Sequence, residues 1–159
     1  MSGVRLRECE QSDLDRFFAF QLDRDANRMA AFTREDPADR EAFDALWRRI
    51  TDDESVVTRT VMADGEVAGS IMTFVRDDEG QTEVTYWIDP ARWGRGIASQ
   101  ALAALLGEVG VRPLHARVAK DNLRSLGVLR RNGFAVVGED AGYAAGRGEV
   151  VEEYLLRLG

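Results

Sequence analysis

The sequence predicts one α+β domain built on a mixed β-sheet. Three observations lead to this prediction. A run of three strand-like segments lies in the middle of the chain, helix-like and strand-like segments alternate after it, and no linker or repeat interrupts the 159 residues. A chain of this length can bury most of its apolar surface in a single core. We therefore expect one domain over residues 1–159.

The N-terminal third is expected to hold one strand and two helices. Val4–Glu8 alternates apolar and charged side chains, as a strand does. Asp13 suits the N-cap of a first helix, and Asp36 followed by Pro37 predicts the start of a second. Residues 23–35 between them are expected to be a polar connection. The apolar faces expected are Leu14, Phe17, Phe18 and Leu22 in the first helix, and Ala42, Phe43, Leu46, Trp47 and Ile50 in the second.

Three consecutive strands are expected in the middle of the chain. Ser55–Ala63 and Glu66–Phe74 are rich in β-forming residues and are joined by Asp64-Gly65, a strong hairpin signal. Asp77–Gly80 predicts the next turn, and Gln81–Ile88 the next strand. Because short turns join neighbouring antiparallel strands, these segments predict a meander.

Helices and strands alternate after Asp89-Pro90, which ends the third strand of the meander. Gly133 is expected to close the second of these helices as a left-handed C-cap. The expected elements are a helix at Ile97–Val109, a strand at Leu114–Ala119, a helix at Asn122–Asn132, strands at Phe134–Gly138 and Val150–Leu158, and a glycine-rich tip at Gly142–Gly148.

Composition and charge exclude several classes of function. The net charge is −7, without a basic tract, which argues against nucleic-acid binding. No apolar run approaches the roughly 20 residues that a membrane helix needs, so no membrane partner is expected. Cys9 is the only cysteine, and the N-terminus lacks a secretory signal pattern, so a cytoplasmic location is expected. The acidic residues show no metal-ligand spacing, so no metal is expected.

The segment Trp93–Ser99 has the features of an anion site. A strand runs into a short loop with Gly94 and Gly96, and a helix begins directly after it. The first backbone N–H groups of a helix lack partners within the helix, and the helix dipole adds positive charge there. Glycine lets an anion approach these groups closely, and Arg95 could add a side-chain charge. The residues alone therefore predict an anion site.

Two nucleotide-binding patterns fit this segment poorly. A Walker loop ends in Gly-Lys-Ser/Thr, and no lysine is present here. A Rossmann fingerprint needs a third glycine, where Ala98-Ser99 stands, and an acidic residue at the end of the next strand.

The segment resembles the cofactor loop of the GNAT superfamily of N-acetyltransferases, whose pattern is Gln/Arg-x-x-Gly-x-Gly/Ala. In Trp93–Ala98 the fourth and sixth positions match, and tryptophan stands first. This form resembles the branch that includes the ribosomal-protein N-terminal acetyltransferases. A second block, Asn122–Phe134, resembles the Asn-x-x-Ser…Gly-Phe segment of the family, which is a helix beside the pantetheine arm.

The resemblance implies a mostly antiparallel sheet of about seven strands flanked by about four helices, with a splay between the fourth and fifth strands. Acetyl-CoA would thread into that gap, and backbone amides near Trp87 and Ile88 would bond its acetyl carbonyl. A primary amine would then take the acetyl group by direct attack in a ternary complex. The cofactor-binding residues implied are Trp87, Ile88, Trp93, Gly94, Arg95, Gly96, Ile97, Ala98, Ser99 and Asn122.

Two residues are candidates for the proton chemistry. Glu83 stands where members of this branch often carry a glutamate and could take the proton of the amine, or it could only pair across the sheet. Ser125 could protonate the thiolate, or it could bond its own helix backbone. In many family members a tyrosine in this helix is the acid, but Leu129 stands there. Tyr86 is a weaker candidate.

The acceptor is expected to be a small-molecule or peptide amine. In the family's fold the first two helices and the last hairpin form the acceptor side, which here implies Met29, Phe32 and Tyr143. A homodimer is left open. The alternative function is a non-catalytic acetyl-CoA-binding module that acts as a sensor or scaffold.

Overall fold

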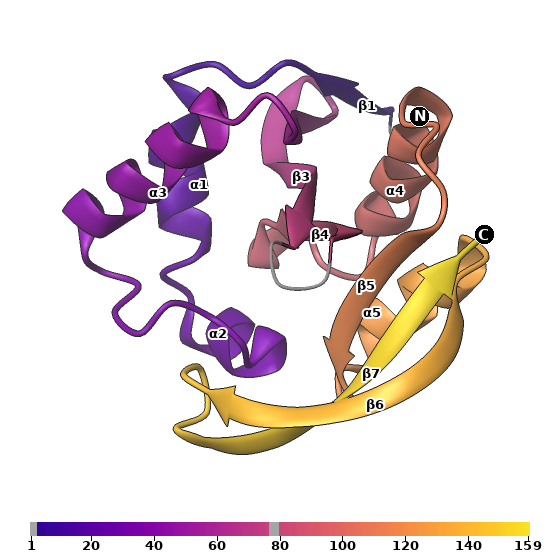
Figure 1. Ribbon diagram of the computed structural model, residues 1–159. Coiled ribbons are helices and arrows are strands. Elements are labelled where there is room, and N and C mark those ends of the chain that lie inside the picture. Colours follow the sequence, from indigo (N-terminus) through magenta and orange to yellow (C-terminus); the bar gives the residue numbers. More distant parts are fainter. Residues whose placement is uncertain (1–2, 77–79) are drawn as a thin grey trace.

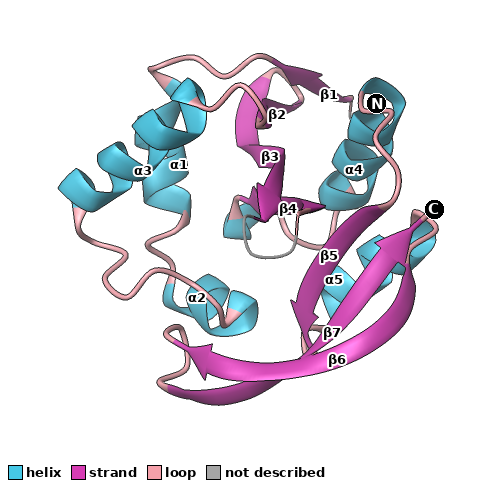
Figure 2. Cartoon of the chain, viewed as in Figure 1, coloured by secondary structure: helices cyan, strands magenta, loops and turns pink. Residues whose placement is uncertain are grey.

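A mixed sheet forms the centre of the molecule (Figure 2). The computed structural model describes residues 3–76 and 80–159, and within these ranges seven strands pair in the order β1-β2-β3-β4-β5-β7-β6. All neighbours are antiparallel except β4 and β5, which are parallel. The strands are β1 Val4–Arg7, β2 Val57–Ala63, β3 Glu66–Arg76, β4 Gln81–Ile88, β5 Leu114–Ala119, β6 Ala135–Ala144 and β7 Glu149–Leu158.

Helices cover both faces of the sheet and make three layers (Figure 1). The α-helices in the described ranges are α1 Asp13–Phe20, α2 Arg24–Ala30, α3 Arg40–Asp52, α4 Ile97–Glu108 and α5 Leu123–Arg131. Phe17 and Trp47 belong to the core between α1, α3 and one face of the sheet. Leu102 and Leu129 belong to the larger core between α4, α5 and the opposite face of the sheet. The predicted fold class is confirmed. No helix of these ranges is long and apolar enough to cross a membrane.

The start of α1 differs from the prediction in how Asp13 is used. Ser12 holds the N-cap position, without a side-chain cap bond, and Asp13 is the first helical residue. The Asp13 carboxylate is only 3% exposed and accepts hydrogen bonds from Arg7 and Thr60 at 2.7–2.8 Å. A tertiary ion pair has therefore replaced the local cap. Leu22 lies beyond the helix and is 43% exposed, while Phe20 is buried.

Two further predictions in this third of the chain are wrong. The expected polar connection contains α2, whose N-cap Asp23 accepts a hydrogen bond from the Ala26 amide. Helix α3 begins at Arg40 and not at Pro37, because Asp39 is its N-cap and accepts from the Ala42 amide. Its Ala42 side chain is exposed.

The elements after α3 follow the prediction closely. Asp64 and Gly65 both have positive φ, 53° and 80°, as the β2–β3 turn requires. The expected turn at Asp77–Gly80 lies largely outside the described residues. Asn122 is the N-cap of α5, and Gly133 has φ 92° beyond its end.

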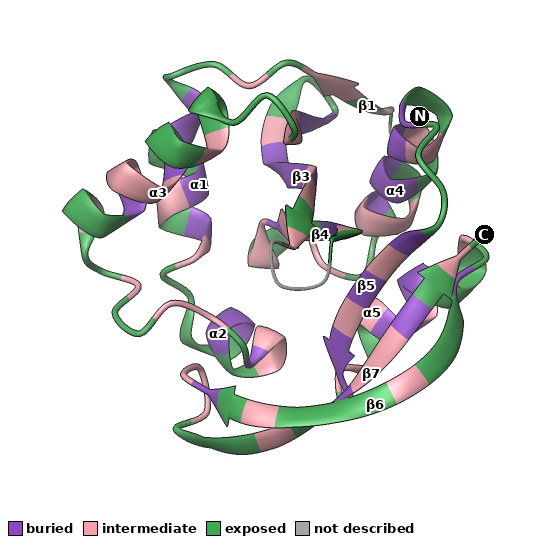
Figure 3. Ribbon diagram, in the orientation of Figure 1, coloured by how far each residue is buried: buried purple, intermediate pink, exposed green. Residues whose placement is uncertain are grey.

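The last hairpin is longer than expected. Strand β6 does not stop at Gly138 but continues to Ala144, because a register shift between Val136 and Gly138 lets its pairing with β7 resume. The connecting tip is therefore shorter than Gly142–Gly148. Most of β6 is exposed at the edge of the sheet (Figure 3). A homodimer through this edge stays a prediction.

The sheet opens between β4 and β5. In the described residues their parallel ladder has one register pair, Glu83 with His115. On its other side β4 stays paired with β3 as far as Ile88, opposite Gly69. A Cβ at Gly69 would lie 2.2 Å from the Trp87 carbonyl oxygen, so glycine is required for this close approach. Strand β4 is thus fixed on one edge and free on the other.

The Asp13 ion pair predicts a loss of stability in acid. Burial alone would raise the pKa of Asp13, but hydrogen bonds from Arg7, the Glu10 amide and Thr60 outweigh it and lower the pKa to about 2. Because its pKa is lowered, the ionised Asp13 carboxylate stabilises the fold at pH values above about 4, the ordinary pKa of an aspartate. This contribution is lost as the pH falls through about 2. We expect a loss of about 2 kcal/mol between pH 4 and 2.

Urea unfolding across this pH range measures the effect. Asp13→Asn is expected to be less stable at pH 7 and to have a flatter pH dependence between pH 4 and 2. Asp15→Asn is the matched control, because Asp15 is the next acid on the helix and its side chain is 77% exposed. Equal slopes for Asp13→Asn and the unmodified chain would contradict the prediction.

Candidate active site

A cavity of about 980 Å³ lies at the splay between β4 and β5. Its walls come from both helical layers: α1, α2 and α3 on one side, and the loop after β4 with α4 and α5 on the other. Residues from Glu83 to Ile88 line it along β4, and residues from Ala116 to Ala119 line it along β5. The cavity therefore reaches through the sheet and connects its two faces.

The predicted anion loop forms one end of this cavity. Gly94 and Gly96 both have positive φ, 81° and 74°, and Gly96 is the N-cap of α4 without a side chain to satisfy the first amides. Amides at the start of a 12-residue helix are thus left for an anion. Arg95 is exposed and does not line the cavity. The predicted loop residues that do are Trp93, Gly94, Gly96, Ile97, Ala98 and Ser99.

Trp93, the unusual first residue of the loop, ties the loop to its surroundings. Its indole Nε1 donates a hydrogen bond to the Ile88 carbonyl oxygen at 3.1 Å. The Arg124 guanidinium of α5 lies over its ring, 5.1 Å from the centroid, and Arg124 also lines the cavity. Trp93 thereby holds the end of β4, the loop and the start of α5 together, and a positive charge lies beside the helix N-terminus.

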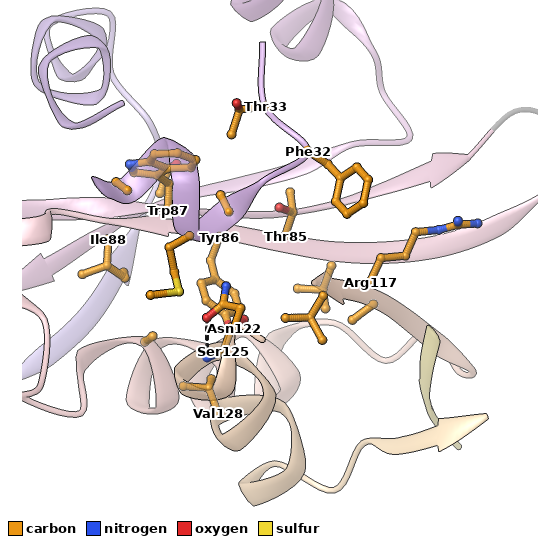
Figure 4. Close-up of a pocket in the computed structure, with 18 of the residues that line it drawn as sticks. Phe32, Thr33, Thr85, Tyr86, Trp87, Ile88, Arg117, Asn122, Ser125 and Val128 are labelled. Carbon is orange, nitrogen blue, oxygen red and sulfur yellow. Dashed lines mark hydrogen bonds between the residues drawn. The ribbon is translucent and has the colours of Figure 1, made fainter. Parts of the chain in front are cut away.

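A hydroxyl pair lies in the middle of the cavity (Figure 4). Tyr86 from β4 and Ser125 from α5 bring their oxygens to 2.6 Å. The Asn122 side chain accepts from the Ser125 amide at 3.2 Å, which fixes the first turn of α5. Burial raises the pKa of Tyr86 to about 12, against a lowering effect of the Ser125 hydrogen bond, so the phenol keeps its proton.

Tyr86, the weaker candidate for the proton chemistry, is the partner of Ser125 in the cavity. The alternation of β4 was the available signal: Val84, Tyr86 and Ile88 face α4 and α5, whereas Trp87 packs toward α1 and α3. That signal gives the face of Tyr86 but not its partner, which lies 39 residues away.

Glu83 is buried between two arginines, with 4% of its surface exposed. Arg76 of β3 donates to both carboxylate oxygens, at 3.1 Å to Oε1, and Arg117 of β5 donates to Oε2 at 3.4 Å. Arg117 also pairs with Glu153 of β7 at 3.2 Å. Glu83 does pair across the sheet, but in a buried cluster that lines the cavity and not on an exposed surface.

The residues expected on the acceptor side separate into two groups. Met29 of α2 and Phe32, which follows α2, line the cavity. Tyr143 does not; it is 67% exposed on β6.

The tip of the last hairpin fastens α2 in place. The Gly146 amide donates to the Ala31 carbonyl oxygen at 2.8 Å, and a Cβ at Gly146 would lie 2.1 Å from the Asn27 carbonyl oxygen. Arg147 donates to the Arg28 carbonyl oxygen and forms a bidentate pair with Asp121 at 2.5–2.6 Å. Arg147 therefore anchors α2 at the wall of the cavity.

A metal centre is not indicated by the described part of the chain. In residues 3–76 and 80–159, no group of three His, Cys, Asp or Glu side chains is arranged to hold a metal ion.

The segment that holds the anion loop and the hydroxyl pair matches a known protein family. The family described as "Acetyltransferase (GNAT) domain" matches residues 4–135. The chain belongs to the GNAT family of acetyltransferases. Most of the fold lies within this match, and so do the anion loop, Asn122 and Ser125.

Solved structures share the fold of this acetyltransferase. A ribosomal-protein-alanine N-acetyltransferase from Brucella melitensis is 22% identical with a TM-score of 0.81, covering 96% of this chain and 98% of its own. The RimJ of Mycobacterium smegmatis, in complex with CoA-disulfide, is 21% identical with a TM-score of 0.81, and the coverage is 98% and 81%. Among curated proteins none matches the chain.

A third structure of the same fold holds both CoA and an amine. It is the spermidine N-acetyltransferase from Vibrio cholerae with CoA and spermine, 16% identical with a TM-score of 0.77, and the coverage is 97% of this chain and 95% of that one. At these identities the three structures support the fold alone.

An acidic substitution in the first turn of α4 separates stability from anion binding. Ser99 lies in this turn and lines the cavity, and an added carboxylate there favours the helix dipole but repels an anionic ligand. We expect Ser99→Asp to keep or raise the unfolding midpoint and to weaken acetyl-CoA binding at least tenfold, as measured by calorimetry. Gln100→Glu is the control, because the next residue is exposed and outside the cavity. Equal weakening in both variants would contradict a site at Ser99.

Proposed function

We propose that this chain transfers the acetyl group of acetyl-CoA to a primary amine by direct attack in a ternary complex. The observation that carries the proposal is the cavity through the splayed sheet. An anion site built from a helix N-terminus lies on one face, and the part of the same cavity under α1–α3 lies on the other. Two substrates entering from opposite faces can meet at β4. A cytoplasmic location belongs to the same proposal, and the lone Cys9 thiol fits it.

The loop and the start of α4 are proposed to hold the pyrophosphate. Their fit rests on the free amides after Gly96, the positive φ of both glycines and the guanidinium of Arg124 beside them. Further along, the edge of β4 that faces β5 makes no ladder beyond Glu83, so its backbone groups face the cavity near Trp87 and Ile88. Such amides can bond a carbonyl oxygen and stabilise negative charge as it develops there.

Bound acetyl-CoA supplies an acetyl thioester, whose carbonyl carbon is attacked by the amine while the sulfur leaves as a thiolate. The chain must then accept one proton from the amine and deliver one to the sulfur. Glu83 is proposed to receive the amine proton, directly or through a water, since it is the carboxylate at the point where β4 and β5 diverge. Arg76 and Arg117 hold it in position.

Ser125 is proposed to deliver the proton to the sulfur, with Tyr86 as its partner. Either oxygen of the pair can be the donor, and Tyr86 replenishes the proton that Ser125 gives up. Because the pKa of the phenol is raised to about 12, Tyr86 stays protonated at neutral pH. Leu129 of α5 stands where many family members carry a tyrosine. In this chain the phenol beside Ser125 comes from Tyr86 of β4.

A direct assay distinguishes an enzyme from a cofactor-binding module. Calorimetry with acetyl-CoA is expected to show binding, and thiol release across a panel of primary amines is expected to show turnover with at least one class. Binding of acetyl-CoA with no thiol release on any amine would favour the sensor or scaffold function. The absence of any binding would contradict both.

The hydroxyl pair predicts a defect in turnover and not in binding. Ser125→Ala and Tyr86→Phe are each expected to lower kcat by about 100-fold, the lower end of the usual range for loss of an acid catalyst, with little change in the KM for acetyl-CoA. Tyr154→Phe is the control, because it removes a phenol that lies outside the cavity and under Lys120. A kcat unchanged in both test variants would show that solvent protonates the sulfur.

A further inference from the structure

The acceptor compartment has an uneven distribution of charge. The carboxylates that line the cavity are Glu83, Asp140 and Glu153, all on strands. Each of them accepts a hydrogen bond from Arg117, at 3.2–3.4 Å, and Glu83 is also paired with Arg76. Two guanidinium groups, Arg76 and Arg117, therefore offset most of the three negative charges within the chain.

The opposite wall carries no carboxylate. Among the described residues of α1, α2, α3 and the segment between α2 and α3, the cavity is lined by apolar and neutral side chains and by one cation, Arg34. Phe17, Trp47 and Met72 give this part of the cavity an aromatic and thioether surface. A ligand with several ammonium groups would have to leave its extra charges without partners here, which is unfavourable in a buried site.

Two polar atoms of the residues that line the cavity are buried without a partner in the described part of the chain. The indole Nε1 of Trp87 and the hydroxyl Oγ1 of Thr33 have no hydrogen-bonding group among the described residues, and both side chains line the cavity (Figure 4). Indole can only donate, so its missing partner must be an acceptor. Buried polar groups are almost always satisfied, and leaving one unpaired costs about 1–3 kcal/mol. A ligand oxygen at this position would remove that cost.

We infer that the acceptor is a compact monoamine with an apolar body and one hydrogen-bond-accepting oxygen, which Trp87 recognises, and that polyamines and aminoglycosides are poor substrates. This inference rests on the proposed function and specifies its second substrate. The apolar body occupies the aromatic surface under α1 and α3, the oxygen accepts from the Trp87 indole, and the single amine points toward the splay at Glu83.

Matched amines test the inference. Thiol release is measured with phenylalaninamide, with 2-phenylethylamine, which lacks the oxygen, and with spermidine and kanamycin as polycations. We expect kcat/KM for phenylalaninamide to exceed that of either polycation at least tenfold. We expect Trp87→Phe to reduce the preference for phenylalaninamide over 2-phenylethylamine by about tenfold, the usual size of a lost neutral hydrogen bond. The ratio of the two kcat/KM values cancels any loss that Trp87→Phe causes equally with both amines.

The outcomes separate this inference from the proposed function. Turnover with spermidine or kanamycin in preference to the monoamines would overturn the inference and leave the acetyltransferase function intact. An equal loss with both monoamines in Trp87→Phe would overturn the role of the indole N–H. Calorimetric titration of phenylalaninamide into the CoA-saturated chain gives a second readout that needs no turnover. No binding there, together with no thiol release from any amine, would overturn both proposals.

Discussion

The structure depends on the buried ion cluster around Glu83, which fixes where the sheet closes and where it opens. Glu83 forms the register pair between β4 and β5, and arginines from both neighbouring strands bind its carboxylate. A charge buried to this degree requires such partners, because an unpaired one would be strongly destabilising. Three strands are thus fixed at one end of the splay, so that β4 and β5 can separate at the other and leave a cavity between them.

The second constraint is the connection between distant ends of the chain around that cavity. The hairpin tip at Gly146 approaches α2 so closely that a side chain would not fit, and Arg147 adds an ion pair with Asp121. The small buried side chains of Ala31, Ala119 and Ala144 permit this approach. The α2 part of the cavity wall is therefore held by the C-terminal hairpin, although α2 lies in the first fifth of the sequence.

Local signals explain which parts of the fold could be predicted. Strands β4 and β5, the start of α4 and the cap of α5 were predicted to the residue, because glycine, proline and asparagine act on their immediate neighbours. The N-terminal third offered several aspartates that each suit a helix start. Tertiary contacts chose among them: Asp13 serves an ion pair, and Asp39 caps α3 in place of Asp36. The partners in the site, such as Tyr86 with Ser125 and Glu83 with Arg117, lie more than 30 residues apart, and no local pattern specifies them.

The alternation of β4 has a consequence for how this protein can diverge. Successive residues of a strand point to opposite faces, so Tyr86 and Ile88 belong to the layer of α4 and α5, while Trp87 belongs to the layer of α1 and α3. A substitution at an odd-numbered position changes one compartment and leaves the packing of the other largely as it was. One strand therefore lets the surface under α1 and α3 change while the surface beside α4 and α5 keeps its shape.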